Sequence, residues 1–367
     1  MVTKVIKIED REPVDESGLR EAAEIIRGGG LVAFPTETVY GLGANALDGE
    51  AAQKIYAAKG RPSDNPLIAH VADWEGMLPL VADIPENAKK LADAFWPGPM
   101  TLILNKSSRI PKATSGGLDT VAIRMPSDPV AHKLIELSGV PIAAPSANTS
   151  GRPSPTRAEH VLEDMNGKIE LILDGGPVKV GVESTIVDLT GEVPALLRPG
   201  AVTLSMLEKI LGKVDIDPAL KGPLAGDVHP KAPGMKYRHY APKAELILVE
   251  GNPDEVVNMI NTKVREAVNA NRLTGIIATA ESQNRYPLGI VKSIGMRSSE
   301  ESIAHNLFSV LREFDDAGVD IIYSESFPSD DLGQAIMNRL MKAAGYHSIH
   351  VIPKKNPEAE GDFKKES

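Results

Sequence analysis

The chain has 367 residues, no cysteine, and 50 acidic against 40 basic side chains, which gives a formal net charge of −10. This length suits two domains better than one core. The lack of cysteine excludes disulfides, thiolate catalysis and cysteine-bound zinc, and it fits a reducing compartment, so we expect a cytoplasmic protein. The acidic balance argues against a general nucleic-acid binder and confines any RNA contact to a local patch.

The ends of the chain carry charged segments. We expect no signal peptide, because charges interrupt "MVTKVIKIEDREP" and no apolar core follows it. No apolar run approaches the ~18 residues of a membrane span, so we expect no membrane association. Residues 354–367 are charged and contain proline, and we expect them to be a disordered tail.

Residues 1–212 alternate short strand and helix signals. Ser17 is a candidate N-cap for the helix in "SGLREAAEIIRGGG", which ends in glycine. Strands are predicted at "KVIKI", "LVAF", "PLIAHV", "TLILNK", "TVAIRM", "PIAAP", "LILDGG", "STIVDLT" and "ALLRPG", and helices at "GEAAQKIYAAKG" and near residues 85–95, 129–138, 157–166 and 203–211. Many short strands with proline-rich connections predict one twisted, mixed α/β sheet.

Residues 244–353 show a cleaner alternation of strands and amphipathic helices, from "AELILVEG" to "LGQAIMNRLMKAAG". This pattern predicts a smaller, Rossmann-like domain with a doubly wound parallel sheet. Residues 213–243 form the linker between the two domains. Within the linker, "APGMKYRHYAP" (residues 232–242) is unusual, because it carries three cationic or titratable side chains and two tyrosines between prolines.

The common nucleotide and metal motifs are absent or weak. No G-x-x-x-x-G-K-[ST] stretch occurs, so any ATP is not held by a P-loop. "GLGANA" (residues 41–46) matches a dinucleotide fingerprint, but "PTETVY" separates it from the preceding strand, which favours turn glycines in a tight loop. No H-E-x-x-H or histidine and acid cluster appears, so we expect no dedicated protein metal site.

Two polar loops follow apolar elements. In "AAKGRPSDNPL", Lys59 and Arg61 stand where a helix ends and a stiff loop begins, which suits either a phosphate grip with Asn65 or ordinary bases at a helix C-terminus. "AAPSANTSGRPSPT" offers hydroxyls and exposed N–H groups that suit phosphate or adenine recognition, or a solvated loop. Its polar side chains include Ser146, Asn148, Ser150 and Ser154.

Two arginines lie at the ends of apolar strands. Arg124 in "LDTVAIRMP" and Arg198 in "ALLRPG" each need an anion beside the guanidinium, from a structural salt bridge or from a ligand. Together with the two cations of the first loop, they allow a convergent cationic pocket. Ser184 opens the strand in "GVESTIVDL", and in "FPTETVYG" the threonines 36 and 38 flank Glu37.

Read in order, these segments resemble the YrdC-like threonylcarbamoyl-AMP synthase family. The resemblance spans roughly residues 15–212 and rests on "FPTETVYGLG", "AAKGRPSDNPLIAHV", "FWPGPMTLIL", "GLDTVAIRMP", "PIAAPSANTSGRPSPT", "GVESTIVDL" and "LLRPGA". The pairing of "KGR" with a later "SAN" is specific to this family. The segment "APGMKYRHYAP" followed by an α/β domain is similar to the two-domain form of the enzyme, with a Rossmann-like C-terminal domain.

The resemblance implies both a fold and a reaction. The fold is a twisted α/β sheet with a concave, basic cavity. The reaction joins L-threonine, bicarbonate or CO2, and ATP (with Mg²⁺ carried by the ATP) into threonylcarbamoyl-AMP, and releases pyrophosphate. A separate protein complex then transfers the threonylcarbamoyl group to the adenosine beside the anticodon of certain tRNAs. We therefore expect hand-over to such a complex and only weak or indirect contact with tRNA.

The resemblance also assigns individual residues. The residues expected to bind L-threonine are Thr38, His70, Arg124, Ala144 and Ser184. Among them, Arg124 pairs with the carboxylate and Ala144 acts through its backbone. The residues expected to bind ATP are Lys59, Arg61, Asn65, Thr120, Ser146, Asn148, Ser154, Arg198 and Tyr237. Lys59, Arg61 and Arg124 are the expected catalytic cations. Tyr237, Arg238 and His239 belong to a lid that we expect to close over the cavity, because a carbamate and a mixed anhydride are sensitive to water.

Three other functions compete with this interpretation. An RNA-binding module would use the basic face without ATP chemistry, and its RNA affinity would fall steeply with salt. A carbamoyl-transfer maturation factor would carry zinc-binding cysteines, of which this chain has none, and an extra N-terminal domain, which we do not expect here. The interpretation as a nicotinamide-dependent enzyme rests on "GLGANA" alone.

The sequence shows no long exposed apolar stripe that would require a partner chain, so we expect a monomer.

Overall fold

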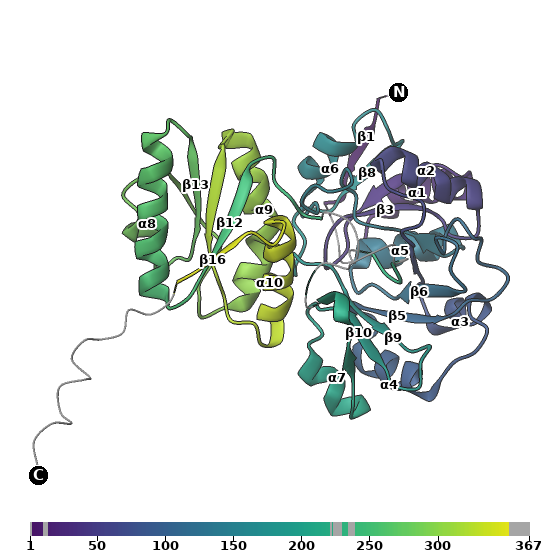
Figure 1. The fold of residues 1–367 in the computed structure, drawn as a ribbon. Coiled ribbons are helices and arrows are strands. Elements are labelled where there is room, and N and C mark those ends of the chain that lie inside the picture. The colour runs from purple at the N-terminus through teal and green to yellow at the C-terminus, as the bar shows by residue number, and fades with distance from the viewer. Residues whose placement is uncertain (1, 10–13, 221, 223–229, 234–238, 352–367) are drawn as a thin grey trace, which may run out of the picture.

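The computed structural model describes residues 2–9, 14–220, 222, 230–233 and 239–351, which form two α/β domains side by side (Figure 1). The first domain is built on an 11-stranded mixed sheet in the order β1-β8-β2-β3-β7-β4-β6-β5-β9-β10-β11. Its strands are β1 (Lys4–Lys7), β2 (Val32–Phe34), β3 (Gly41–Asn45), β4 (Ile68–His70), β5 (Met100–Asn105), β6 (Thr120–Arg124), β7 (Ile142–Ala143), β8 (Leu171–Asp174), β9 (Thr185–Asp188), β10 (Ala195–Arg198) and β11 (Asp215–Ile216).

Helices cover both faces of this sheet. They are α1 (Glu16–Arg27), α2 (Gly49–Lys59), α3 (Trp74–Met77), α4 (Glu86–Phe95), α5 (Pro129–Ser138), α6 (Ala158–Met165) and α7 (Leu204–Leu211), with short 3₁₀ turns η1 (Leu78–Leu80) and η2 (Pro218–Leu220). One apolar cluster joins α1 and α5 to β2 and β8, and a second joins α2, α4 and α6 to the opposite face. Because both faces are covered, the strands read as apolar runs rather than as alternating patterns.

The first helix differs from the sequence prediction in its cap. Asp15, not Ser17, is the N-cap of α1, and its carboxylate accepts a hydrogen bond from the backbone N–H of Ser17 at 2.9 Å. A carboxylate suits this position because it also meets the positive end of the helix dipole. Asp48 and Asp128 cap α2 and α5 in the same way.

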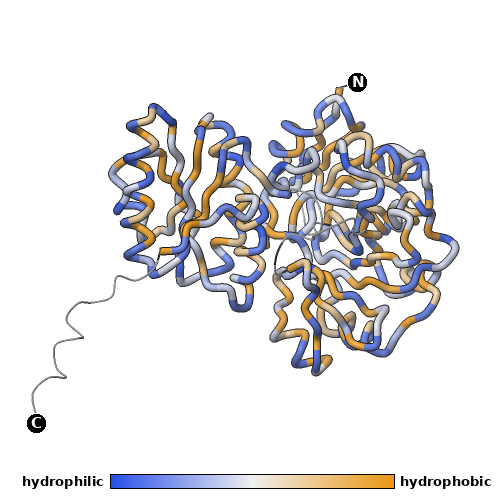
Figure 2. The backbone as a smooth tube through the Cα atoms, in the orientation of Figure 1, coloured by the Kyte–Doolittle hydropathy of each residue, from blue (hydrophilic) through white to orange (hydrophobic). Residues whose placement is uncertain are grey.

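The second domain carries a five-stranded sheet in the order β14-β13-β15-β12-β16, with every pair parallel. Its elements are β12 (Glu245–Glu250), α8 (Pro253–Asn269), β13 (Thr274–Ala278), η3 (Gln283–Arg285), β14 (Ile290–Ser293), α9 (Glu300–Ala317), β15 (Ile321–Glu325), α10 (Asp331–Ala343) and β16 (Ser348–His350). Helix α8 covers one face, and α9 and α10 cover the face toward the first domain (Figure 1). Figure 2 shows apolar residues along the strands and hydrophilic residues on the outer helix faces. The predicted fold class is confirmed for both domains.

The two domains share a buried polar and apolar interface. Arg312 of α9 donates to the carboxylate of Asp164 at 2.8 Å and to the carbonyl of Pro153 at 2.7 Å. Val39 and Val182 of the first domain belong to the same apolar cluster as the inner faces of α9 and α10. The domains therefore pack through specific contacts, although the linker between them lies partly outside the described residues. None of the helices that the structure describes is long and apolar enough to span a membrane.

The sequence suggested that "GLGANA" is a tight loop, and this prediction is wrong. Residues 41–45 form β3, which pairs antiparallel with β2 and β7. Glycine is needed at position 43 because a Cβ there would lie 2.7 Å from Cε1 of Phe34 and 2.8 Å from Cγ2 of Ile142. Its glycines lie inside a strand paired on both sides, whereas the glycines of a dinucleotide fingerprint lie in the turn between a strand and a helix. The nicotinamide interpretation therefore loses its only support.

The Gly43→Ala substitution tests this packing requirement. We expect it to lower the free energy of unfolding by about 1–3 kcal/mol, since the added methyl group must displace a core ring or an isoleucine. Gly191→Ala is the matched control, because its Cβ would come no closer than 3.6 Å to any neighbour. Denaturant unfolding of both variants measures the difference, and equal midpoints would contradict the packing requirement at position 43.

Candidate active site

The ends of several central strands meet at one place in the large sheet. Strands β4 and β6 run parallel and end together, so that His70 and Arg124 are register partners. Thr101 of the antiparallel β5 lies opposite Arg124. Ser184 immediately precedes β9, and Arg198 ends β10. Polar side chains that are far apart in sequence thereby converge because the sheet mixes parallel and antiparallel neighbours.

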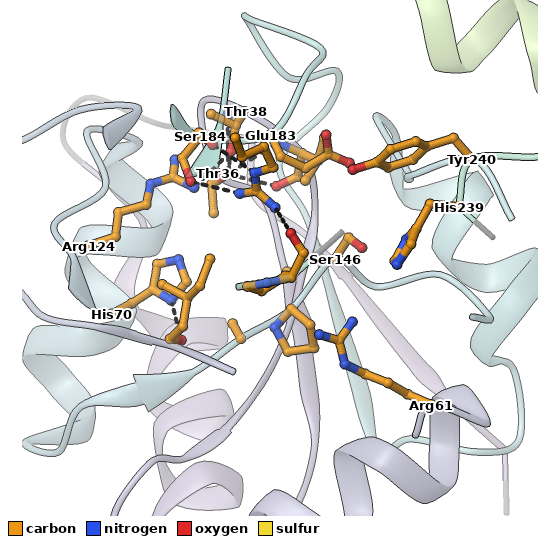
Figure 3. Close-up of a pocket in the computed structure, with 17 residues that line it drawn as sticks. Thr36, Thr38, Arg61, His70, Arg124, Ser146, Glu183, Ser184, His239 and Tyr240 are labelled. Atoms are coloured by element: carbon orange, nitrogen blue, oxygen red, sulfur yellow. Dashed lines mark hydrogen bonds between the residues drawn. The ribbon is translucent and has the colours of Figure 1, made fainter. Parts of the chain in front are cut away.

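These strand ends surround a small cavity (Figure 3). It is lined by Thr36, Thr38, Val39, Gly41, Arg61, Ile68, His70, Arg124, Ala144, Pro145, Ser146, Glu183, Ser184, Arg198, Pro233, His239 and Tyr240. Arg124 and His70 lie on one side, and Arg61, His239 and Tyr240 lie on the other. The free space is about 40 Å³, and in the same measure one water molecule needs roughly 10–15 Å³.

Arg124 is buried beside a carboxylate that the sequence analysis did not assign to the site. Its Nη2 lies 2.8 Å from Oε1 of Glu37, and its Nη1 donates to Oγ1 of Thr38 at 2.9 Å. Burial pushes the pKa of Glu37 up, but the attraction of Arg124 outweighs it and holds that pKa below its ordinary value. The two side chains therefore form a buried ion pair.

His70 is a neutral imidazole with a defined acceptor. Burial, followed by repulsion from Arg124, lowers the pKa of His70 to about 3. Its Nδ1 lies 3.1 Å from the carbonyl of Ile68, which can only accept, so Nδ1 carries the proton. In the neutral ring Nε2 is then an acceptor, which suits a ligand hydroxyl. The backbone N–H of Ala144 donates to the same carbonyl at 2.9 Å and fixes the neighbouring wall.

Ser184 and Arg198 form one hydrogen-bonded unit. Arg198 donates from Nε to the carbonyl of Ser184 at 2.9 Å and from Nη2 to its hydroxyl at 3.1 Å. That hydroxyl also lies 2.7 Å from Oγ1 of Thr101. Burial lowers the pKa of Arg198 to about 10, which still leaves the guanidinium charged at neutral pH. The unit therefore presents a fixed cation and a fixed hydroxyl.

Lys59 holds the loop that contains "SAN" (residues 146–148) through hydrogen bonds to its backbone. Its Nζ donates to the carbonyls of Ser146 at 2.5 Å and of Asn148 at 2.6 Å. Burial, followed by repulsion from Arg61, lowers the pKa of Lys59 well below its ordinary value. The amide of Asn148 donates to two further carbonyls of the same loop. Ser146 lines the cavity, whereas Lys59 and Asn148 stand behind it and fix the loop.

Arg61 faces the cavity and is held by carbonyl groups. Its Nε donates to the carbonyl of Asn65 at 3.3 Å, and its Nη2 donates to that of Pro66 at 3.1 Å. Burial lowers its pKa to about 10. The side-chain oxygen of Asn65 is buried without a partner in the described structure. Thr120 begins β6, four residues before Arg124, and does not line the cavity.

The linker segment 232–242 reaches the site where the structure describes it. Pro233, His239 and Tyr240 line the cavity. Burial, followed by repulsion from Arg61, lowers the pKa of His239 well below its ordinary value, and its Nε2 is buried without a partner in the described structure. Tyr237 and Arg238 lie outside the described residues, so their assignment to a lid stays a prediction.

Several lining residues were not assigned from the sequence, and Glu183 is the most important of them. Ser154 donates to its Oε1 at 2.5 Å, which places Ser154 behind the cavity wall rather than in it. The sequence could have indicated Glu183, because an acid beside the buried strand in "GVESTIVDL" needs a cationic partner just as a buried arginine needs an anion. The position of Glu37 in "FPTETVYG" could have indicated that residue in the same way.

Two side chains that line the cavity have buried atoms without a hydrogen-bond partner in the described structure. They are Nη2 of Arg124, whose close contact is the ion pair with Glu37, and Nε2 of His239. Such atoms are costly unless a ligand or water satisfies them, which marks the cavity as a binding site. In the described part of the chain, no three histidine or acidic side chains group closely enough to hold a metal ion.

Comparison with known proteins agrees with this geometry. Residues 24–200 match a sequence family described as "Telomere recombination", and residues 202–345 match one described as "Threonylcarbamoyl-AMP synthase, C-terminal domain". The threonylcarbamoyl-AMP synthases of Pyrococcus abyssi and Bacillus subtilis are 52% and 48% identical to the chain, over 94% and 93% of it and over 99% and 96% of their own lengths.

A solved structure also resembles the whole chain. The crystal structure of P. abyssi Sua5 complexed with L-threonine is similar with a TM-score of 0.90 at 51% identity, and the match covers 95% of this chain and 100% of that one. The relatives carry the name of an enzyme, which supports the synthase interpretation and gives no support to a separate RNA-binding module.

The pH dependence of stability tests the neutral state of His70. Its folded pKa of about 3 lies below the ordinary 6.5, so between these values the unfolded chain binds a proton that the folded protein does not. Stability is therefore lost as pH falls through this window. We expect the stability advantage of the wild type over His70→Asn to shrink by about 2 kcal/mol between pH 7.5 and pH 5. Denaturant unfolding at both pH values measures this, and parallel pH profiles would show that His70 is not held neutral.

Proposed function

The chain belongs to the threonylcarbamoyl-AMP synthase family, and from this premise we propose that it joins L-threonine, CO2 or bicarbonate, and ATP into L-threonylcarbamoyl-AMP, with release of pyrophosphate. The observation that carries the proposal is a set of buried cations whose partners are mostly neutral carbonyl groups. Such cations keep their charge for anionic ligands, and the substrates of this reaction bring a carboxylate, a carbamate and a triphosphate.

L-Threonine occupies the side of the cavity that contains Arg124 and His70. The guanidinium of Arg124 pairs with the substrate carboxylate, and the hydroxyls of Thr38 and Ser184 lie beside it. Nε2 of His70 accepts the threonine hydroxyl. The backbone at Ala144 closes the pocket around the substrate. Because Glu37 already pairs with Arg124, the incoming carboxylate shares or replaces that contact.

ATP occupies the opposite side. Arg61 and Arg198 face the phosphates, and the loop that carries Ser146 lies against the nucleotide with Lys59 and Asn148 behind it. Small residues let the loop backbone approach closely, and its N–H groups suit phosphate oxygens. The nucleotide-binding assignments of Asn65, Thr120, Ser154 and Tyr237 remain proposals. Mg²⁺ arrives with ATP, because Glu183, which lines the cavity, and Glu37, which lies beside Arg124, are each already engaged by an arginine.

The chemistry then needs positioning and charge neutralisation. The neutral amine of threonine adds to CO2 and loses a proton, which gives a carbamate. A carbamate oxygen attacks the α-phosphorus of ATP, the bond to the β-phosphate oxygen breaks, and pyrophosphate leaves. Both reacting groups are anionic, so Arg61, Arg124 and Arg198 stabilise their approach and the pentavalent phosphorus. No covalent nucleophile is required.

The segment 232–242 covers the reacting groups. Support comes from its described residues Pro233, His239 and Tyr240, which line the cavity. Excluding water protects the carbamate and the mixed anhydride.

The product would be handed to a separate complex that modifies the adenosine beside the anticodon of tRNA. Contact of this chain with tRNA would be weak or indirect, because its net charge is −10. We place the reaction in the cytoplasm, where tRNA and ATP meet, and we propose that the protein acts as a monomer.

Pyrophosphate release tests the proposed reaction. We expect release only when L-threonine, bicarbonate and ATP are all present, with incorporation of labelled bicarbonate into the product. Arg124→Ala should reduce the rate by at least 100-fold, since it removes a charge-assisted contact to the substrate carboxylate and leaves Glu37 unpaired. Arg109→Ala is the control, because Arg109 is exposed and lies away from the cavity. ATP turnover that is indifferent to threonine would refute the proposal.

A further inference from the structure

Arg339 is a completely buried arginine of the second domain that contacts Glu183 in the wall of the cavity. It lies on α10 and is 0% exposed. Its Nε donates to Oε2 of Glu183 at 3.1 Å, and its Nη2 donates to the backbone carbonyl of Glu183 at 3.4 Å. Its Nη1 donates to the carbonyls of Pro199 and Ala335. One guanidinium therefore holds residues next to both Ser184 and Arg198.

Glu183 connects this contact to the rest of the site. Its other carboxylate oxygen accepts from Ser154 at 2.5 Å. Burial and a hydrogen bond with Glu183 raise the pKa of Tyr240, to about 12, and Figure 3 shows the two side chains pointing toward each other. The carboxylate thus ties together the serine-rich loop, the linker segment and the second domain. It also lines the cavity itself.

The charge on Glu183 makes its pairing important for the neighbouring cation. Arg339 is the strongest attractive influence on this carboxylate, and Arg198 is the next. Without Arg339, the buried carboxylate would turn to Arg198, because an unpaired charge is costly in a dry interior. Arg198 would then lose both its hydrogen bonds to Ser184 and its free positive charge.

We propose that Arg339 is a positioning residue of the reaction, through which the second domain fixes Glu183 and thereby keeps Ser184 and Arg198 in place for the substrates. The proposal rests on the function proposed above and deepens it, because it makes the C-terminal domain part of the active site. A lysine at position 339 cannot reproduce the contact, since a point charge does not span three carbonyls and a carboxylate as the planar fork does.

Arg312 provides a matched control for simple domain docking. It is 2% exposed, lies on the neighbouring α9, and also crosses the interface. Its partners are Asp164, Glu163 and the carbonyl of Pro153, none of which lines the cavity. Substituting lysine at position 312 or 339 therefore disturbs the interface in a similar way, but only position 339 touches residues that line the cavity.

The experiment measures pyrophosphate release and calorimetric L-threonine binding by the wild type, Arg339→Lys and Arg312→Lys, each as the full chain and at a temperature where all are folded by circular dichroism. We expect Arg339→Lys to lose at least tenfold in kcat/KM for L-threonine, as misplaced catalytic groups do. Arg312→Lys should stay within threefold of the wild type. Glu183→Asp withdraws the carboxylate from Arg339 by one methylene and should reproduce the loss. This variant replaces Arg339→Lys in the test if Arg339→Lys does not fold.

The outcomes separate the two proposals. If the wild type reacts and Arg339→Lys is no less active than Arg312→Lys, the positioning role is wrong and the proposed function stands. The same follows if Glu183→Asp keeps full activity. A wild type that neither releases pyrophosphate nor binds L-threonine would overturn both. A selective loss at positions 339 and 183, with comparable unfolding midpoints for the two lysine variants, would establish that Arg339 acts on the site rather than on docking.

Discussion

The structure depends on burying cations without burying an equal number of carboxylates beside them. In the described part of the chain, Lys59, Arg61 and Arg198 form no ion pair, and their hydrogen bonds go mainly to backbone carbonyls. A carbonyl satisfies an N–H donor but leaves the charge in place. Burial lowers the pKa values of these groups, which expresses the cost of the arrangement. The gain is a preformed positive site for substrates that would otherwise repel one another.

Such a site requires a rigid frame, and the mixed sheet provides it. Parallel pairing of β4 with β6 brings His70 beside Arg124, and parallel pairing of β5 with β9 brings Thr101 near Ser184. Helices on both faces bury the strands, so the strand ends that carry His70, Arg124 and Arg198 cannot easily shift. The second domain adds the buried Arg339 of α10, which contacts Glu183 in the cavity wall. The unpartnered polar atoms of the cavity are what remains for ligands to satisfy.

Local patterns predicted most elements and the chemical character of the site, whereas contacts between distant segments were not accessible from one sequence. The strand of Arg124 and the helix ending at Lys59 follow from apolar runs and glycine caps. The role of "GLGANA" was misjudged because Gly43 packs against Phe34 of the paired strand and against Ile142, which is remote in sequence, and the sequence alone shows neither contact. Likewise, nothing near Arg339 indicates Glu183 as its partner. Two arginines at strand ends correctly indicated a cationic pocket. The sequence did not indicate that most of its cations are held by carbonyl groups and not by carboxylates.

The most direct measurement is the calorimetric titration of Arg61→Gln and Arg124→Gln with L-threonine and, separately, with a non-hydrolysable ATP analogue. If buried cations on opposite sides of the cavity each serve one anion, Arg124→Gln loses at least tenfold in threonine affinity and keeps nucleotide binding, and Arg61→Gln shows the reverse. Equal losses of both ligands in both variants would contradict a division of the cavity into two anion sites, and would mean that the cations act only by supporting the fold.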